Sequence, residues 1–114
     1  MKKLLIGVLF ALLVVTALSA QNQPSVRIVN DTGEVIYFVY ISPSESEDWG
    51  QDALGGEILE SGQTATIPLP RPLGNGNLYD IKLEATYDHY TKYKITASNN
   101  TRIVFTVNDL ELTE

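Results

Sequence analysis

The sequence predicts an all-β fold, a two-sheet sandwich of about seven short antiparallel strands, immunoglobulin-like or transthyretin-like. Three observations predict it. The apolar or alternating segments are short, turn residues separate them roughly every 8–12 positions, and no segment after residue 20 has the apolar period of a helix. The 114-residue chain contains no cysteine, so hydrophobic burial must stabilise this fold without disulfides.

The first two strands are expected at residues 26–30 and 35–41, on either side of a turn rich in Asn, Asp and Gly. The second segment is apolar on both faces, which is typical of a central strand that is covered on both sides. The alternative is an exposed face on which Ile36, Phe38 and Tyr40 meet a ligand.

Two shorter strands are expected at residues 57–59 and 64–69. The second of these alternates, which places its apolar residues on one face. Pro68 has no N–H group to donate to a neighbouring strand. This strand must therefore lie at the edge of a sheet, or end at the proline.

The clearest alternation in the chain predicts a hairpin of residues 78–87 and 91–97. Glu84 is expected to face Lys94 across this hairpin as a pair of opposite charges. The last strand is expected at residues 102–107, before a polar tail. The side chains expected to point inward from these strands are Tyr79, Ile81, Leu83, Ala85, Tyr87, Tyr93, Ile95, Ala97, Ile103, Phe105 and Val107.

Residues 1–20 have the pattern of a secretory signal peptide, in which Lys2 and Lys3 precede an apolar run and Ala20 supplies a small residue for cleavage. The apolar run is shorter than the roughly 20 residues that a membrane anchor needs. We therefore expect cleavage after Ala20. The product would be one β-sandwich domain, residues 21–114, that is secreted or periplasmic and has no stable membrane span.

The chain is acidic, with 14 Asp and Glu residues against eight Lys and Arg and a formal net charge of −6. Loss of Lys2 and Lys3 with the signal leaves six basic residues and a net charge of −8. Nucleic acid and anionic membranes are disfavoured as partners, because phosphate binding needs a basic surface. A protein or glycan partner of the cell envelope, or a cation, is expected instead.

The loop of residues 42–56 is the most unusual segment, because it combines the only tryptophan with three glycines and clustered acidic residues. We expect a structural plug, in which Trp49 and Leu54 tuck into one end of the sandwich while Asp52 accepts hydrogen bonds from backbone N–H groups. One helical turn is expected at residues 44–51. The residues of this plug are Trp49, Gly50, Asp52, Leu54 and Gly55.

Two other interpretations of the same region remain open. Calcium takes oxygen ligands from carboxylates, although the residue spacing of a dedicated calcium loop is absent. The ligands of such a calcium site would be Glu45, Glu47, Asp48, Asp52 and Glu57. Exposed aromatic residues can also form a patch that binds a sugar or a protein. That patch would consist of Tyr40, Trp49 and Tyr90.

Catalysis is not expected. The chain has no cysteine, its only histidine (His89) falls in a predicted turn, and no Gly-x-Ser-x-Gly sequence is present. A zinc or copper site would need more imidazole or thiolate ligands than this chain has. No pair of acidic residues has a spacing that singles it out for glycoside hydrolysis. Apart from calcium, no cofactor is expected.

Residues spread over most of the expected mature chain form a pattern that resembles a known family. They are Asn30, Thr32, Gly33, Ile36, Tyr37, Tyr40, Ser42, Pro43, Ser46, Trp49, Gly50, Asp52, Leu54, Gly55, Leu59, Gly62, Tyr79, Asp80 and Ile81. This pattern resembles a family of small exported bacterial β-sandwich domains of uncharacterised function. In that family an Asp-Gly sequence commonly turns the later hairpin, whereas this chain has residues 88–90 there. The resemblance implies the fold and export, and it carries no catalytic or binding residues.

These observations predict an exported, non-enzymatic β-sandwich protein that acts as a binding or interaction module of the cell envelope. A calcium-binding module that uses the acidic residues of segment 45–57 is the alternative. In both cases the functional site is expected in the loop of residues 42–56, and we also expect Asp80 to form a hydrogen bond near it.

Overall fold

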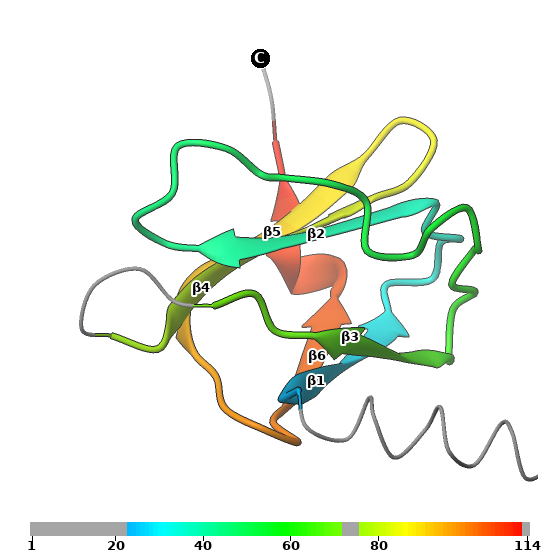
Figure 1. The fold of residues 1–114 in the computed structure, drawn as a ribbon. Helices are drawn as coiled ribbons and strands as arrows, with labels where there is room; N and C mark the ends of the chain where they lie inside the picture. The colour runs from blue at the N-terminus through cyan, green and yellow to red at the C-terminus, as the bar shows by residue number, and fades with distance from the viewer. Residues whose placement is uncertain (1–22, 72–75, 113–114) are drawn as a thin grey trace, which may run out of the picture.

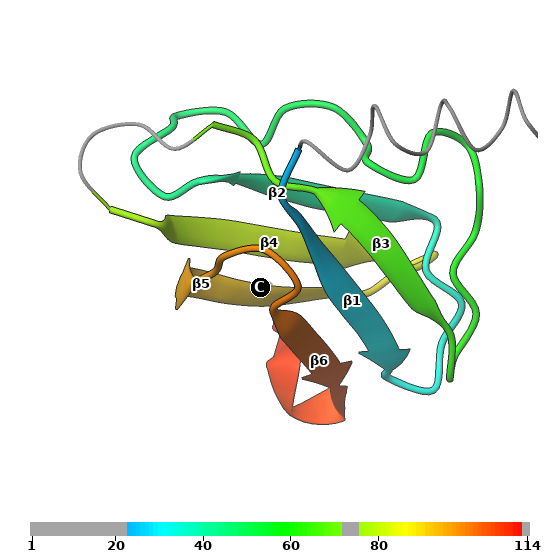
Figure 2. The same cartoon turned by 60° about the horizontal axis from the view of Figure 1, so that its bottom comes forward.

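A computed structural model describes residues 23–71 and 76–112, which form a sandwich of two β-sheets. One sheet has the strand order β3-β1-β6 and the other β2-β4-β5-β7, and they lie as two layers (Figures 1 and 2). The elements are β1 (Ser25–Asp31), β2 (Phe38–Pro43), β3 (Thr64–Pro68), β4 (Leu78–Glu84), β5 (His89–Thr96), β6 (Arg102–Thr106), the 3₁₀ turn η1 (Val107–Asp109) and β7 (Leu110–Glu111). The predicted sandwich is confirmed, whereas the predicted signal peptide lies outside the described residues.

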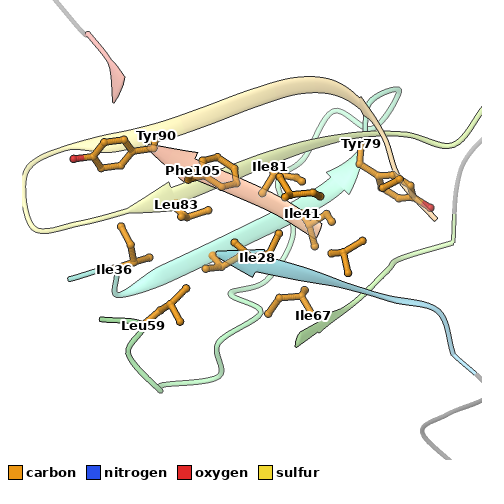
Figure 3. Close-up of a cluster of buried hydrophobic side chains, with 14 of the residues drawn as sticks. Ile28, Ile36, Ile41, Leu59, Ile67, Tyr79, Ile81, Leu83, Tyr90 and Phe105 are labelled. Atoms are coloured by element: carbon orange, nitrogen blue, oxygen red, sulfur yellow. The ribbon is translucent and has the colours of Figure 1, made fainter. Parts of the chain in front are cut away.

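The hydrophobic core lies between the two sheets (Figure 3). Ile81 and Leu83 of β4 point from one sheet toward Ile28 of β1 and Phe105 of β6 in the other, and all four side chains are fully buried. Burial of each such side chain stabilises the fold by roughly 1.5–3 kcal/mol. This core is what holds a chain without cysteine together.

One strand pair departs from the expected antiparallel arrangement. β1 and β6 pair in parallel, with Ile28 opposite Ile103 and Asn30 opposite Phe105. β3 pairs antiparallel with the other side of β1. β1 is therefore the central strand of its sheet, the position that the sequence suggested for residues 35–41.

β2 lies at the edge of its sheet, so the prediction of a central strand covered on both sides is wrong for residues 35–41. Val39 and Ile41 point into the core, whereas Phe38 on the opposite face is 44% exposed. The segment is apolar on both faces because one face belongs to the core and the other, with Phe38 and Tyr40, forms part of an exposed aromatic surface.

β3 lies at the edge of the other sheet, as Pro68 predicts. The proline ends the strand opposite Ser25, where its missing N–H group breaks no ladder hydrogen bond to a further strand. The strand predicted at residues 57–59 is reduced to one isolated bridge between Ile36 and Leu59, whose side chains are both buried.

The hairpin of β4 and β5 contains a bulge that the sequence did not predict. The register shifts within the pair, and Lys94 has a φ of 55°, in the left-handed region. One inserted residue reverses the face of the residues beside it. Tyr93 is therefore 52% exposed rather than in the core as predicted, and Glu84 faces His89 instead of Lys94.

Two further residues predicted to point inward are exposed, Tyr87 in the hairpin turn (94%) and Val107 in η1 (63%). Thr106 and Asp109 cap η1 through reciprocal hydrogen bonds, so part of the predicted polar tail is ordered and leads into β7. Within the ranges that the structure describes, no helix is long and apolar enough to cross a membrane.

Candidate functional site

The outer surface of the four-stranded sheet carries four aromatic side chains and one lysine. We call this surface the aromatic face, and it consists of Phe38, Tyr40, Trp49, Lys82 and Tyr93. β2, β4 and β5 contribute four of these residues, and the loop that follows β2 contributes the tryptophan. The opposite surface of the same sheet faces the core, so the aromatic face is the side on which this sheet meets solvent.

The five side chains form a continuous row. The rings of Phe38 and Tyr40 stack with centroids 6.3 Å apart and an angle of 16° between their planes. The Lys82 Nζ atom lies 5.2 Å from the Tyr40 ring centroid and 4.9 Å from that of Trp49. The rings of Trp49 and Tyr93 lie 6.3 Å apart and are tilted by 48°. Lys82 thus lies between two pairs of aromatic rings.

Strand periodicity places most of this row. Phe38 and Tyr40 are two residues apart on β2 and therefore share a face. Tyr40 pairs with Lys82 across the β2–β4 ladder, so the ammonium group reaches the rings of its neighbouring strand. Glu84, two residues further along β4, lies 3.4 Å from the same ammonium group and balances its charge.

Asp80 positions the two segments that carry Tyr93 and Trp49. Its Oδ1 atom accepts a hydrogen bond from the Lys94 backbone N–H (2.9 Å) and one from the Ser44 hydroxyl (2.7 Å). The first bond fixes the bulge that turns Tyr93 outward. The second fixes the beginning of the loop that carries Trp49. The expected hydrogen bond of Asp80 near this loop is therefore present.

Tyr40 and Tyr93, the two tyrosines of the aromatic face, are uncharged at neutral pH. Burial, followed by the carboxylates of Glu84 and Asp52, raises the pKa of Tyr40 above its usual value. Burial and the hydrogen bond that the Tyr93 hydroxyl donates to Glu111 (3.0 Å) raise the pKa of Tyr93. The phenol groups therefore act as rings and hydrogen-bonding groups, not as anions.

A shallow hollow of about 240 Å³ lies beside the rings of Trp49 and Tyr93. Its lining is mainly polar, with carboxylates from both the loop and β4. The other residues that line it are Ser42, Ser46, Glu47, Asp48 and Asp80. The aromatic face therefore offers ring surfaces next to a group of hydrogen-bond acceptors.

The predicted plug is formed only in part. Asp52 Oδ1 accepts hydrogen bonds from the backbone N–H groups of Val39 and Leu54, both at 3.0 Å, as expected of it. The Ala53 N–H donates to the Val39 carbonyl (2.7 Å), so the loop covers the free edge of β2. Ala53 and Leu54 pack against the core.

Trp49 does not belong to the plug, so its predicted burial in one end of the sandwich is wrong. It is partly exposed and lies against Lys82 and Tyr93 on the outer face. The helical turn predicted at residues 44–51 is also absent. The chain turns at residues 43–46 instead and then returns along β2, and Gly50 and Gly55, which belong to the predicted plug, adopt positive φ angles in this path.

Two of the three residues of the predicted aromatic patch lie together. Tyr40 and Trp49 both contact Lys82, but Tyr90 is only 3% exposed, and its hydroxyl donates a hydrogen bond to Glu34. Lys82 and Tyr93 were not predicted as site residues. Phe38 was named only in the alternative of a ligand-facing surface on residues 35–41, and Ile36, named with it, is buried instead. Strand alternation places Lys82 on the outer face of its strand, but its pairing with Tyr40 depends on the strand order, and the position of Tyr93 depends on the bulge.

The acidic residues proposed as calcium ligands do not converge. Asp52 uses its carboxylate for backbone N–H groups, while the others lie exposed along the loop: Glu45, Glu47, Asp48 and Glu57. Among residues 23–71 and 76–112, no group of three or more Asp, Glu, His or Cys side chains could hold a metal ion. Calcium binding by this loop therefore stays a prediction, which a calcium titration can test.

Comparison with protein-family models, with curated proteins and with solved structures finds no match to this chain. The function is therefore inferred from the geometry of the aromatic face and from the sequence.

Proposed function

We propose that this protein is an exported, non-enzymatic binding module of the cell envelope and that the aromatic face is its binding surface. The observation that carries the proposal is the row of four aromatic rings on one solvent-facing sheet surface, with Phe38 44% and Tyr93 52% exposed. Aromatic side chains are enriched in binding surfaces and dominate their energetics. A contiguous cluster of rings on a solvent-facing surface supports a role in recognition.

The face is built on rigid elements, which supports a role in binding. Three of its rings belong to the strands β2 and β5, and Lys82 belongs to β4 between them. Asp52 fixes the loop to β2, and Asp80 fixes both the loop and the bulge. Side chains that are ordered before a ligand arrives lose less conformational entropy on binding.

The non-enzymatic part of the proposal rests on the sequence, which contains no cysteine and one histidine. In the structure, His89 Nε2 lies 3.2 Å from Glu111 Oε1, on the pair of strands β5 and β7.

A sedimentation assay with bacterial cell-envelope material tests the proposal. Protein purified after export is mixed with the insoluble material, and the bound fraction is measured over a range of protein concentrations. We expect saturable binding that Trp49→Ala and Tyr93→Ala each weaken by about tenfold or more, as the loss of a hot-spot side chain does.

Tyr87→Ala is the matched control, because it removes an exposed tyrosine from the hairpin turn, away from the aromatic face. Its binding should equal that of the unmodified protein. The proposal is wrong if the unmodified protein does not bind, or if the control loses as much binding as the two variants of the face while all three remain folded by circular dichroism.

A further inference from the structure

We infer that the aromatic face binds a carbohydrate chain without net negative charge, an inference that rests on the proposed function. Three features of the face lead to this class of ligand: an internal cation that already occupies the position between the rings, a polar hollow whose fixed charges are acidic, and a row of rings long enough for more than one sugar unit.

The first feature excludes a cationic ligand from the middle of the face. Aromatic rings that surround an empty space attract ammonium groups of ligands. Here the Lys82 ammonium occupies that space, 5.2 Å from the Tyr40 ring centroid and 4.9 Å from that of Trp49. A lysine side chain or a quaternary ammonium group from a partner would find the space between these rings already filled.

The second feature excludes an anionic ligand and disfavours an apolar one. The hollow beside Trp49 is lined by the carboxylates of Glu47, Asp48 and Asp80. A negatively charged ligand would be repelled there. A protein hot spot, by contrast, inserts an apolar side chain into a dry pocket. A polar lining with two serines is a poor match for such an anchor.

A neutral sugar matches both parts of the surface. Its C–H groups form an apolar patch that can lie on the electron-rich face of a ring such as Trp49 or Tyr93. Its hydroxyl groups can donate hydrogen bonds to carboxylates, which accept only. Among the described residues, the two hydrogen bonds that Asp80 accepts end on Oδ1, and its second carboxylate oxygen, Oδ2, can accept from a ligand.

The third feature indicates a chain of sugars rather than a single unit. The ring pair of Phe38 and Tyr40 lies on one side of Lys82, and the pair of Trp49 and Tyr93 lies on the other. A ligand that uses both pairs must continue across the lysine.

A competition assay distinguishes this inference from the proposed function. Untreated envelope material is the bound phase, and two treated samples of the same material are the competitors. Protease digestion removes polypeptide, whereas hydrolysis of the protease-digested material in hot acid cleaves the glycosidic bonds of any sugar chain. We expect the protease-treated sample to compete fully and the acid-treated sample to lose its ability to compete.

Any other pattern overturns the carbohydrate inference. Competition that survives acid hydrolysis indicates a ligand that is not a sugar chain, and competition lost after protease indicates a protein partner. Both results leave the proposed binding function intact, provided that the untreated material is bound. Absence of binding to the untreated material overturns the proposed function itself.

Fluorescence can test whether the ligand binds to the aromatic face. Trp49 is the only tryptophan of the chain, so its emission reports on this surface alone. Titration with the soluble polysaccharide of the protease digest should change that emission with saturation. Tyr93→Ala should weaken the binding by about tenfold, and Tyr87→Ala should leave it unchanged. An emission that does not respond would mean that the sugar binds elsewhere or not at all, which contradicts the inference.

Discussion

The ammonium group of Lys82 lies 4.9 Å from the centre of the Trp49 ring, and this contact ties the loop after β2 to the middle of the four-stranded sheet. The loop is also held at two other points, by Asp52 on β2 and by Asp80 on β4. The only tryptophan of the chain is therefore positioned by contacts on the outside of the fold, and its role differs from that of a core residue.

Stability measurements on single and double variants test the contact between Trp49 and Lys82. Trp49→Ala should lower the free energy of unfolding by about 1 kcal/mol, because a ring on the sheet surface contributes less than a core ring. Phe105→Ala, in the core, should cost about 3–5 kcal/mol. Combining Trp49→Ala with Lys82→Ala should reveal a coupling of about 0.5–1 kcal/mol in urea denaturation. Fully additive losses would show that the two side chains do not interact.

Asp52→Ala should detach the loop from the edge of β2. The backbone N–H groups of Val39 and Leu54 lose their acceptor, which should cost about 1–3 kcal/mol in denaturant unfolding. Hydrogen exchange of the Val39 amide should become faster as well. Asp48→Ala removes an exposed carboxylate from the same loop and is the control, with an expected change below about 0.5 kcal/mol. Equal effects of the two variants would contradict this role of Asp52.

Lys94→Gly should stabilise the protein. Lys94 has a φ of 55°, and the left-handed region costs a residue with a side chain about 1–2 kcal/mol, part of which the greater backbone entropy of glycine offsets. We expect a net gain of about 0.5–1 kcal/mol in chemical denaturation. Thr91→Gly, at an ordinary strand position of β5, should be destabilising instead. A loss of stability in Lys94→Gly would argue against the bulge.

Tyr90 should make stability depend on alkaline pH. Burial, together with the hydrogen bond to Glu34, raises the pKa of Tyr90 from 10.0 to about 12. The folded state therefore keeps the phenol proton after the unfolded state has released it. The resulting stabilisation is fully present below pH 10 and is lost as the pH rises toward about 12. Tyr90→Phe should flatten this part of the stability curve, whereas Tyr87→Phe should leave it unchanged.

Calcium should have no effect on the folded protein. Asp52 already accepts backbone hydrogen bonds, and the carboxylates of Glu45, Glu47 and Asp48 are exposed and do not converge on one point. We expect neither the melting temperature nor the fluorescence of Trp49 to change in millimolar calcium. A rise in melting temperature that Asp48→Asn abolishes would instead support the calcium-binding alternative.

Features that depend on one residue and its neighbours could be predicted from the sequence. Pro68 predicts an edge strand because it lacks an N–H group, and β3 is an edge strand. Asp52, which lies three residues before two glycines that allow a tight path, was expected to accept backbone hydrogen bonds and does so. The alternation of β4 predicts Ile81 and Leu83 in the core, where both lie.

Features that depend on pairing between distant residues could not be predicted. The bulge at Lys94 carries no glycine to mark it, so uninterrupted alternation placed Tyr93 inside. Tyr90 looked like a turn residue, although the hairpin turn ends before it and β5 begins at His89. The apolar segment around Phe38 has the composition of a central strand, and only the strand order shows that it lies at an edge.

The parallel pairing of β1 with β6 has a consequence for the time at which the molecule can fold. Residues 25–31 cannot complete their sheet before residues 102–106 are available. Contacts between segments so remote in sequence slow the search for the native state, because a long loop must close first. A newly made chain would thus stay open until its final strands appear, and such a delay would be compatible with the export that we propose.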